Sequence, residues 1–107
     1  MFASAESALT GQTARVHGRS IAVGDVVLYE GGGHDDTRVG EVYFHAVLRD
    51  EKLVCLSHWP TRRETKHFRK VVVTENVCIF PSAWMLHAVI YTPAEVGQQS
   101  TVLLPAL

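Results

Sequence analysis

The stretch VGEVYFHAVLR, residues 39–49, decides the fold, because it has the clearest hydrophobic period in the chain. A period of two residues is typical of a half-buried antiparallel strand. One face of that strand is expected to be apolar: Val42, Phe44, Ala46 and Leu48. The opposite face is expected to be polar: Glu41, Tyr43, His45 and Arg49. The polar run RDEK, residues 49–52, predicts a turn, and LVCLSHW, residues 53–59, predicts the partner strand of a hairpin.

Short apolar runs separated by turn residues continue on both sides of this hairpin. Before it, residues 14–30 are interrupted at Gly18 and Gly24, which predicts a strand pair followed by the strand Val26 to Tyr29. After it, the sequence predicts one or two strands in KVVVTENVCIF (70–80), a helical turn in PSAW (81–84) and a last short strand in HAVIY (87–91). No amphipathic helical period occurs. The sequence therefore predicts an all-β domain, a small bent β-barrel of six to seven short strands.

The length and composition indicate one globular domain without a membrane-spanning segment. The chain has 107 residues, 47% of them hydrophobic, and a net charge of −1, which excludes the strongly basic class of nucleic-acid-binding domain. The apolar runs are too short to cross a bilayer, and the N-terminus lacks the pattern of a secretory signal. We expect a flexible lead-in over residues 1–13, the domain over 14–92 and a C-terminal tail over 93–107.

The histidines and cysteines raise the question of a metal site. Cys55 and His58 have Cys-x-x-His spacing, and Cys78 and His87 would complete four ligands. Strand alternation would send Cys55 and His58 to opposite faces, so we expect no metal and two buried free thiols in a reducing compartment.

Catalysis is not predicted either. No Ser or Cys lies in the context of a nucleophile elbow. The loop EGGGHDD, residues 30–36, contains His34, Asp35 and Asp36, but its three glycines predict a mobile segment that holds such groups too loosely. We therefore expect a protein that is not an enzyme and that uses no cofactor.

A basic segment follows the Trp59-Pro60 pair. It contains five of the ten Lys and Arg residues of the chain: Arg62, Arg63, Lys66, Arg69 and Lys70. With Trp59 and Phe68 beside them, these residues suit single-stranded nucleic acid through phosphate contacts and base stacking. The same set suits an acidic peptide segment, and the third interpretation is a solvated hairpin loop.

Four collinear segments resemble a bromo-adjacent homology (BAH) domain over residues 14–92. Such domains open with an apolar-Gly-Asp-apolar strand and a later apolar-Gly-polar-apolar strand, matched by Val23 to Val26 and by Val39 to Val42. Their Trp-aromatic-x-Arg-Pro-Glu-Glu-Thr segment is echoed by Trp59 to Thr65, although Pro60 replaces the aromatic residue. The closing segments of the family are echoed by Glu75-Asn76-Val77, Pro81 and Met85 to Tyr91, with His87-Ala88 in place of Gly-Lys.

The resemblance implies a BAH-like, SH3-like β-barrel that binds a protein tail, such as a histone tail, in nuclear chromatin. Several family members enclose a methylated lysine in an aromatic cage. The position of Trp59 implies a cage wall, partly exposed at a strand end; the other candidates for the groove are Tyr43, Tyr29 and Glu41. Two alternatives stay open: a nucleic-acid-binding barrel that uses the basic segment 62–70, and a self-assembly domain that pairs by an exposed strand edge.

Overall fold

The fold was examined in a computed structural model that describes residues 8–30 and 37–104. The expected mobile loop lies, for residues 31–36, outside the described residues. Within these ranges the chain is all-β, as predicted, with a single 3-10 turn, η2 (Ser82–Trp84), at the predicted helical turn. The described part of the chain contains no helix long and apolar enough to cross a membrane. The strands are β1 (Ala8–Gly11), β2 (Thr13–Val16), β3 (Arg19–Ala22), β4 (Val26–Glu30), β5 (Thr37–Leu48), β6 (Glu51–Trp59), β7 (Thr61–Glu64), β8 (Phe68–Val72), β9 (Val77–Pro81), β10 (Met85–Ala88) and β11 (Gln99–Leu103).

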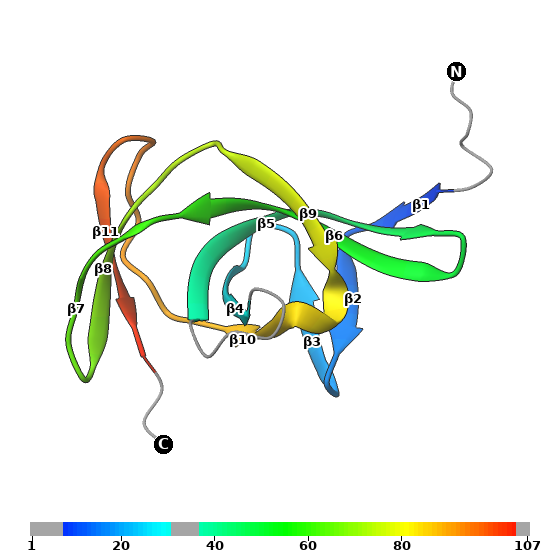
Figure 1. The fold of residues 1–107 in the computed structure, drawn as a ribbon, viewed down its shortest axis with the longest axis horizontal. Helices are drawn as coiled ribbons and strands as arrows, with labels where there is room; N and C mark the ends of the chain where they lie inside the picture. Colours follow the sequence, from blue (N-terminus) through cyan, green and yellow to red (C-terminus); the bar gives the residue numbers. More distant parts are fainter. Residues whose placement is uncertain (1–7, 31–36, 105–107) are drawn as a thin grey trace.

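These eleven strands, more than the six to seven expected, form three sheets (Figure 1). The largest sheet has the order β10-β4-β5-β6-β9, with β1 pairing to β5 in addition. A second sheet has the order β11-β8-β7, and β2 with β3 forms a separate hairpin. None of these sheets closes on itself within the described residues.

The β5–β6 hairpin predicted from the sequence is confirmed, and it turns at Arg49 and Asp50, both with positive φ. The predicted face is wrong beyond Tyr43, because Val42 pairs with Leu56 whereas Phe44 pairs with Cys55. One extra residue in a bulge shifts every later side chain to the other face. Phe44 is accordingly 41% exposed, and His45, expected on the polar face, is buried and bonds through Nε2 to the carbonyl oxygen of Ile21 at 2.9 Å.

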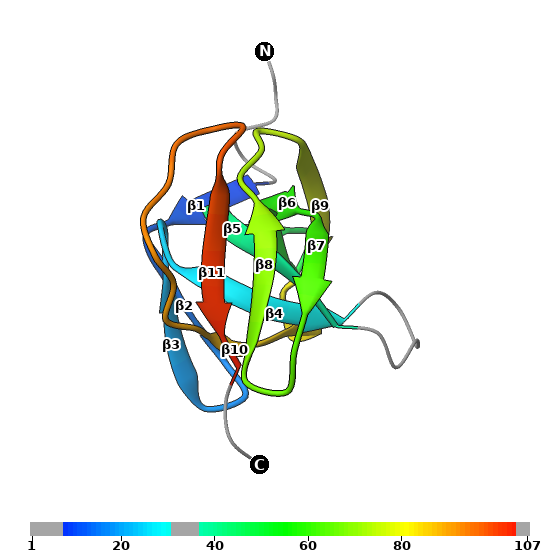
Figure 2. The ribbon, with the colours of Figure 1, turned by 90° about the vertical axis from the view of Figure 1, so that its left-hand side faces the viewer.

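Strand β4 lies between two hydrophobic cores, and all four of its apolar residues are buried. Val27 and Tyr29 face the first core, which lies between the largest sheet and the β2–β3 hairpin: Val16, Ile21, Val27, Tyr29, Val42, Val54, Leu56 and Met85. Val26 and Leu28 face the second core, against the three-stranded sheet that lies in front of β4 and β5 in Figure 2: Val26, Leu28, Val39, Trp59, Val71, Val73 and Val102. Burial on both faces explains why this strand is a continuous apolar run.

The domain extends further at both ends than the sequence indicated. Residues 8–11, placed in the lead-in, form β1 against β5. Residues 99–103, placed in the tail, form β11 against β8, with Val102 fully buried. The last expected strand, HAVIY, is only partly correct: β10 ends at Ala88, and Tyr91 makes an isolated bridge to Val102.

Candidate functional site

Trp59, the expected cage wall, lies in the second core. Its side chain is 3% exposed, and its ring meets that of Tyr91 edge-on with centroids 5.8 Å apart. The expected exposure at a rim is therefore wrong. Pro60 does interrupt the sheet, but the chain continues at once into β7, and the β11-β8-β7 sheet covers the indole.

The other expected groove residues do not gather around Trp59. Tyr29 is 1% exposed and belongs to the first core, on the opposite face of the largest sheet. Tyr43 is the half-buried extra residue at the bulge. Glu41 is half-buried, and burial raises the pKa of its carboxyl group. Trp59 and Tyr29 therefore offer no exposed ring face for an aromatic cage, because both rings are buried in the cores.

The basic segment is a strand hairpin, β7–β8, and its five cations have different surroundings. Arg62, Arg63 and Lys66 are exposed. Lys70 places its Nζ over the Phe68 ring, 5.9 Å from the centroid. Arg69 is buried, with 5% of its surface exposed.

A pocket of about 410 Å³ opens beside this hairpin, and we call it the β5–β7 pocket. Four of its residues come from the segment HWPTRRET singled out in the sequence, and the others come from the start of β5 and from β8. The lining residues are Thr37, Arg38, His58, Pro60, Thr61, Glu64 and Arg69. The sequence thus indicated one wall of the pocket, but no pattern in it pointed to Thr37 or Arg38.

Arg69 is held in a defined position at this pocket. Its Nη2 lies 3.0 Å from Glu64 Oε1 and 3.1 Å from Thr37 Oγ1, and its Nη1 donates to the Thr37 carbonyl oxygen at 3.1 Å. Its Nε has no partner among the described residues. A guanidinium with fixed geometry next to the exposed Arg38 suits a planar anion such as a carboxylate.

His58 lines the pocket and contacts Tyr29 of the first core. Burial raises the pKa of Tyr29 to about 12, so its hydroxyl keeps its proton at neutral pH. Burial, and secondarily the charge of Arg38, lower the pKa of His58. Tyr29 Oη therefore donates to neutral His58 Nδ1 at 2.8 Å. The acidic and basic side chains of the lining are two arginines, Arg38 and Arg69, against one glutamate, Glu64, so the pocket is rich in positive charge.

The lowered pKa of His58 predicts a pH dependence of stability. The unfolded side chain titrates near 6.5 and the folded one below it, so the unfolded chain binds more protons in that interval. The contribution of neutral His58 is complete above pH 6.5 and is lost as the pH falls below it. Urea unfolding between about pH 7.5 and 5 should show this decline, and His58→Gln should flatten it. An equally steep decline in the variant would contradict the assignment.

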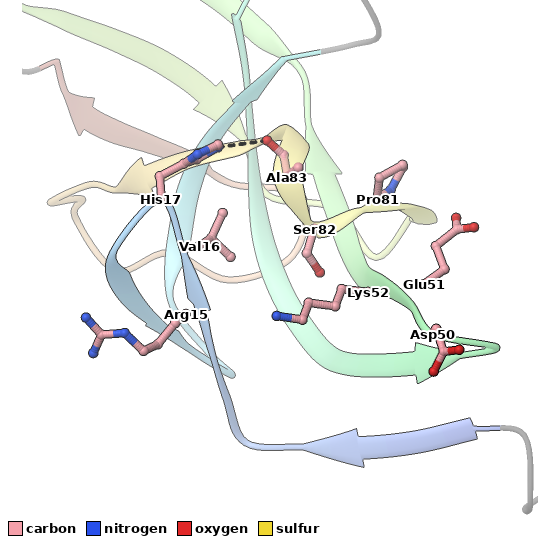
Figure 3. A pocket seen from close by; sticks show the side chains of 9 residues that line it. All are labelled: Arg15, Val16, His17, Asp50, Glu51, Lys52, Pro81, Ser82 and Ala83. Atoms are coloured by element: carbon pink, nitrogen blue, oxygen red, sulfur yellow. Dashed lines mark hydrogen bonds between the residues drawn. The ribbon is translucent and has the colours of Figure 1, made fainter.

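A second pocket, of about 400 Å³, lies at the turn of the β5–β6 hairpin (Figure 3). His17, at positive φ, bonds through Nε2 to the Ala83 carbonyl oxygen at 2.9 Å across its rim. The remaining lining residues are Arg15, Val16, Asp50, Glu51, Lys52, Pro81 and Ser82. Its two cations and two carboxylates cancel, so it favours neither kind of ion.

No metal-binding group was found in the part of the chain that the structure describes, where no three His, Cys, Asp or Glu side chains gather. Cys55 is buried and Cys78 is half-buried, and both are free thiols. Comparisons with protein-family models, with curated proteins and with solved structures gave no match.

Proposed function

We propose that this domain is a non-enzymatic recognition module that binds an acidic segment of a protein in the β5–β7 pocket. The observation that carries the proposal is the buried guanidinium of Arg69, oriented by Thr37 and Glu64 beside the exposed Arg38. Burying an arginine is costly, and Thr37 and Glu64 hold this one at the pocket, where its charge adds to that of Arg38. A carboxylate that enters the pocket meets Arg38 as a first contact.

The free edge of β7 supports an extended peptide as the ligand. β7 is the terminal strand of its sheet and pairs only with β8 among the described strands. An extended peptide can add to such an edge through main-chain hydrogen bonds, while side-chain pockets supply specificity. All four β7 residues are exposed, and Arg62 and Arg63 add positive charge along that edge.

A nucleic-acid ligand is less well supported, because the basic segment lacks open stacking surfaces. Trp59 is buried, and Lys70 lies over the ring of Phe68. Binding of single strands usually combines phosphate contacts with base stacking on aromatic rings. Only the phosphate contacts would be left here, through Arg62, Arg63 and Lys66.

The chromatin setting and the nuclear localisation enter the proposal through the BAH resemblance. The same resemblance is the basis for proposing that the three sheets are a divergent form of the BAH barrel. Within that setting the positive pocket fits an acidic segment better than a basic histone tail, since Arg38 would repel lysine and arginine side chains.

Arg38→Ala should weaken binding of a glutamate-rich peptide about tenfold, because a charge-assisted hydrogen bond to a ligand contributes on the order of 1.5 kcal/mol. Arg38 is exposed, so its loss should leave the fold intact. The matched control is Arg49→Ala, an exposed arginine in the turn that follows the far end of β5, which should bind as the wild type does. Isothermal titration calorimetry of the three proteins measures the difference.

The same titration with a single-stranded oligonucleotide separates the two ligand classes. The proposal predicts no measurable oligonucleotide binding at physiological salt and an unchanged result for Arg38→Ala. Binding of the oligonucleotide in preference to the acidic peptide, lost in Arg62→Ala and Arg63→Ala, would replace the proposal with the nucleic-acid alternative.

A further inference from the structure

Strand β9 is an unprotected edge of the largest sheet. It lies at the end of the order β10-β4-β5-β6-β9 and pairs with β6 on one side only (Figure 1). Among the described residues, no backbone bond from a loop, turn or cap reaches Val77–Phe80. One row of its main-chain donors and acceptors is therefore open to another strand.

Two other terminal strands, β7 and β11, have a feature that opposes pairing with a second copy, and β9 has neither. The β7 edge carries Arg62, Arg63 and Glu64. The β11 edge is covered by the segment before it, through backbone bonds from Thr92 to Thr101 and from Leu103 to Ile90, both of 2.9 Å. β9, VCIFP, has no charged residue, and its proline stands only at the last position. Proteins use charges, bulges, prolines or covering segments to block edge pairing, so a bare edge indicates a pairing strand.

An apolar row continues from this edge onto the sheet. Ile79 and Phe44 pair with Cys55 from opposite sides, and they are 63% and 41% exposed. Val77, two residues along β9, is 54% exposed. Cys55 between them is only 6% exposed. The exposed side chains of β9 thus belong to a larger apolar surface of the kind that marks contact sites.

We propose that β9 pairs antiparallel with β9 of a second copy of this chain, around a two-fold axis at Ile79. This register sets Ile79 opposite Ile79 of the second copy, and Val77 opposite Pro81. The strand is uncharged, so no like charges oppose each other across the axis. An isologous contact of this kind closes after two copies, and it joins the two apolar rows into one.

Sedimentation velocity at rising concentration tests the pairing. A five-residue edge is small compared with the roughly 1,200 Å² of a stable interface, so we expect dissociation in the micromolar range. Ile79→Lys and Val77→Lys should each raise the dissociation constant at least about tenfold, because a lysine on an edge strand blocks pairing. The control Ile90→Lys, at an apolar side chain that is 72% exposed, should dimerise as the wild type does. Circular dichroism confirms that each variant is folded.

A cross-linking experiment tests the register. In a background with Cys55→Ala and Cys78→Ser, which removes the free thiol that pairs with Ile79 inside one chain, mild oxidation should join two copies of Ile79→Cys through a disulfide, because the paired residues lie directly opposite each other. Val77→Cys should form this link much more slowly. A wild-type chain that stays monomeric at about 500 µM, a dimer that Ile79→Lys leaves intact, or equal cross-linking at the two positions would overturn the proposal.

Discussion

Trp59→Ala is expected to lower the free energy of unfolding by about 3 to 5 kcal/mol, the cost of removing a large aromatic side chain from a core. The indole is 3% exposed. It belongs to a core whose other residues come from β4, β5, β8 and β11 and from Val73, just after β8. In a domain of this size such a loss lowers the thermal midpoint by more than about 10 °C. Urea unfolding, followed by circular dichroism, measures it.

Two further variants make the result specific. Trp84→Ala removes a half-buried tryptophan that stacks on Phe80, and it should cost clearly less. Trp59→Phe should also be milder, because the indole Nε1 has no partner among the described residues and its removal relieves an unsatisfied buried donor. If Trp59→Ala lowers the free energy of unfolding by less than about 1 kcal/mol, the level of a surface substitution, then Trp59 is not a core residue and the aromatic-cage hypothesis is supported again.

Gly40→Ala is expected to destabilise the domain by about 1 to 3 kcal/mol, the usual cost of overpacking a core. A Cβ at this position would lie 2.7 Å from Leu56 Cδ1, 2.7 Å from the Ser57 carbonyl oxygen and 3.3 Å from Tyr29 Cε1. The Leu56 side chain can move, but the Ser57 oxygen belongs to the backbone of β6. The central β5–β6 hairpin would therefore have to shift.

A double-mutant cycle with Leu56→Val tests this explanation. Leu56→Val removes the methyl group that the new Cβ meets, so its own cost should shrink in the Gly40→Ala background. The carbonyl contact stays, and the rescue should be partial. Strict additivity of the two losses, or a neutral Gly40→Ala, would show that the strands separate easily at this point.

The fold class and the central hairpin followed from the sequence, because strand periodicity is a local property. The alternation in residues 39–49 gave β5, and the apolar run at Val26 to Tyr29 gave β4. The bulge at Tyr43 did not follow, since nothing in the local pattern marks the extra residue. For that reason His45 was placed outside and Phe44 inside, the reverse of the structure.

The candidate site depends on long-range packing, and the sequence predicted only the part of it that lies in one continuous segment. The segment HWPTRRET does line a pocket, through residues such as His58 and Glu64. The burial of Trp59 depends on the return of residues 99–103 as β11 beside β8, and the sequence of that tail does not decide whether it packs back. The place of Arg38 beside Arg69 likewise depends on how two sheets meet.

The most direct test of the acidic-ligand pocket is a map of amide chemical shifts in the ¹⁵N-labelled protein while a glutamate-rich peptide is added. Binding as proposed shifts the amides of the pocket lining, above all Thr37, Arg38, Thr61, Glu64 and Arg69, and leaves the turn at Asp50 unchanged. Chemical-shift changes confined to the part of the β7–β8 hairpin around Lys66 and Lys70, or no saturable changes at all, would contradict the proposal.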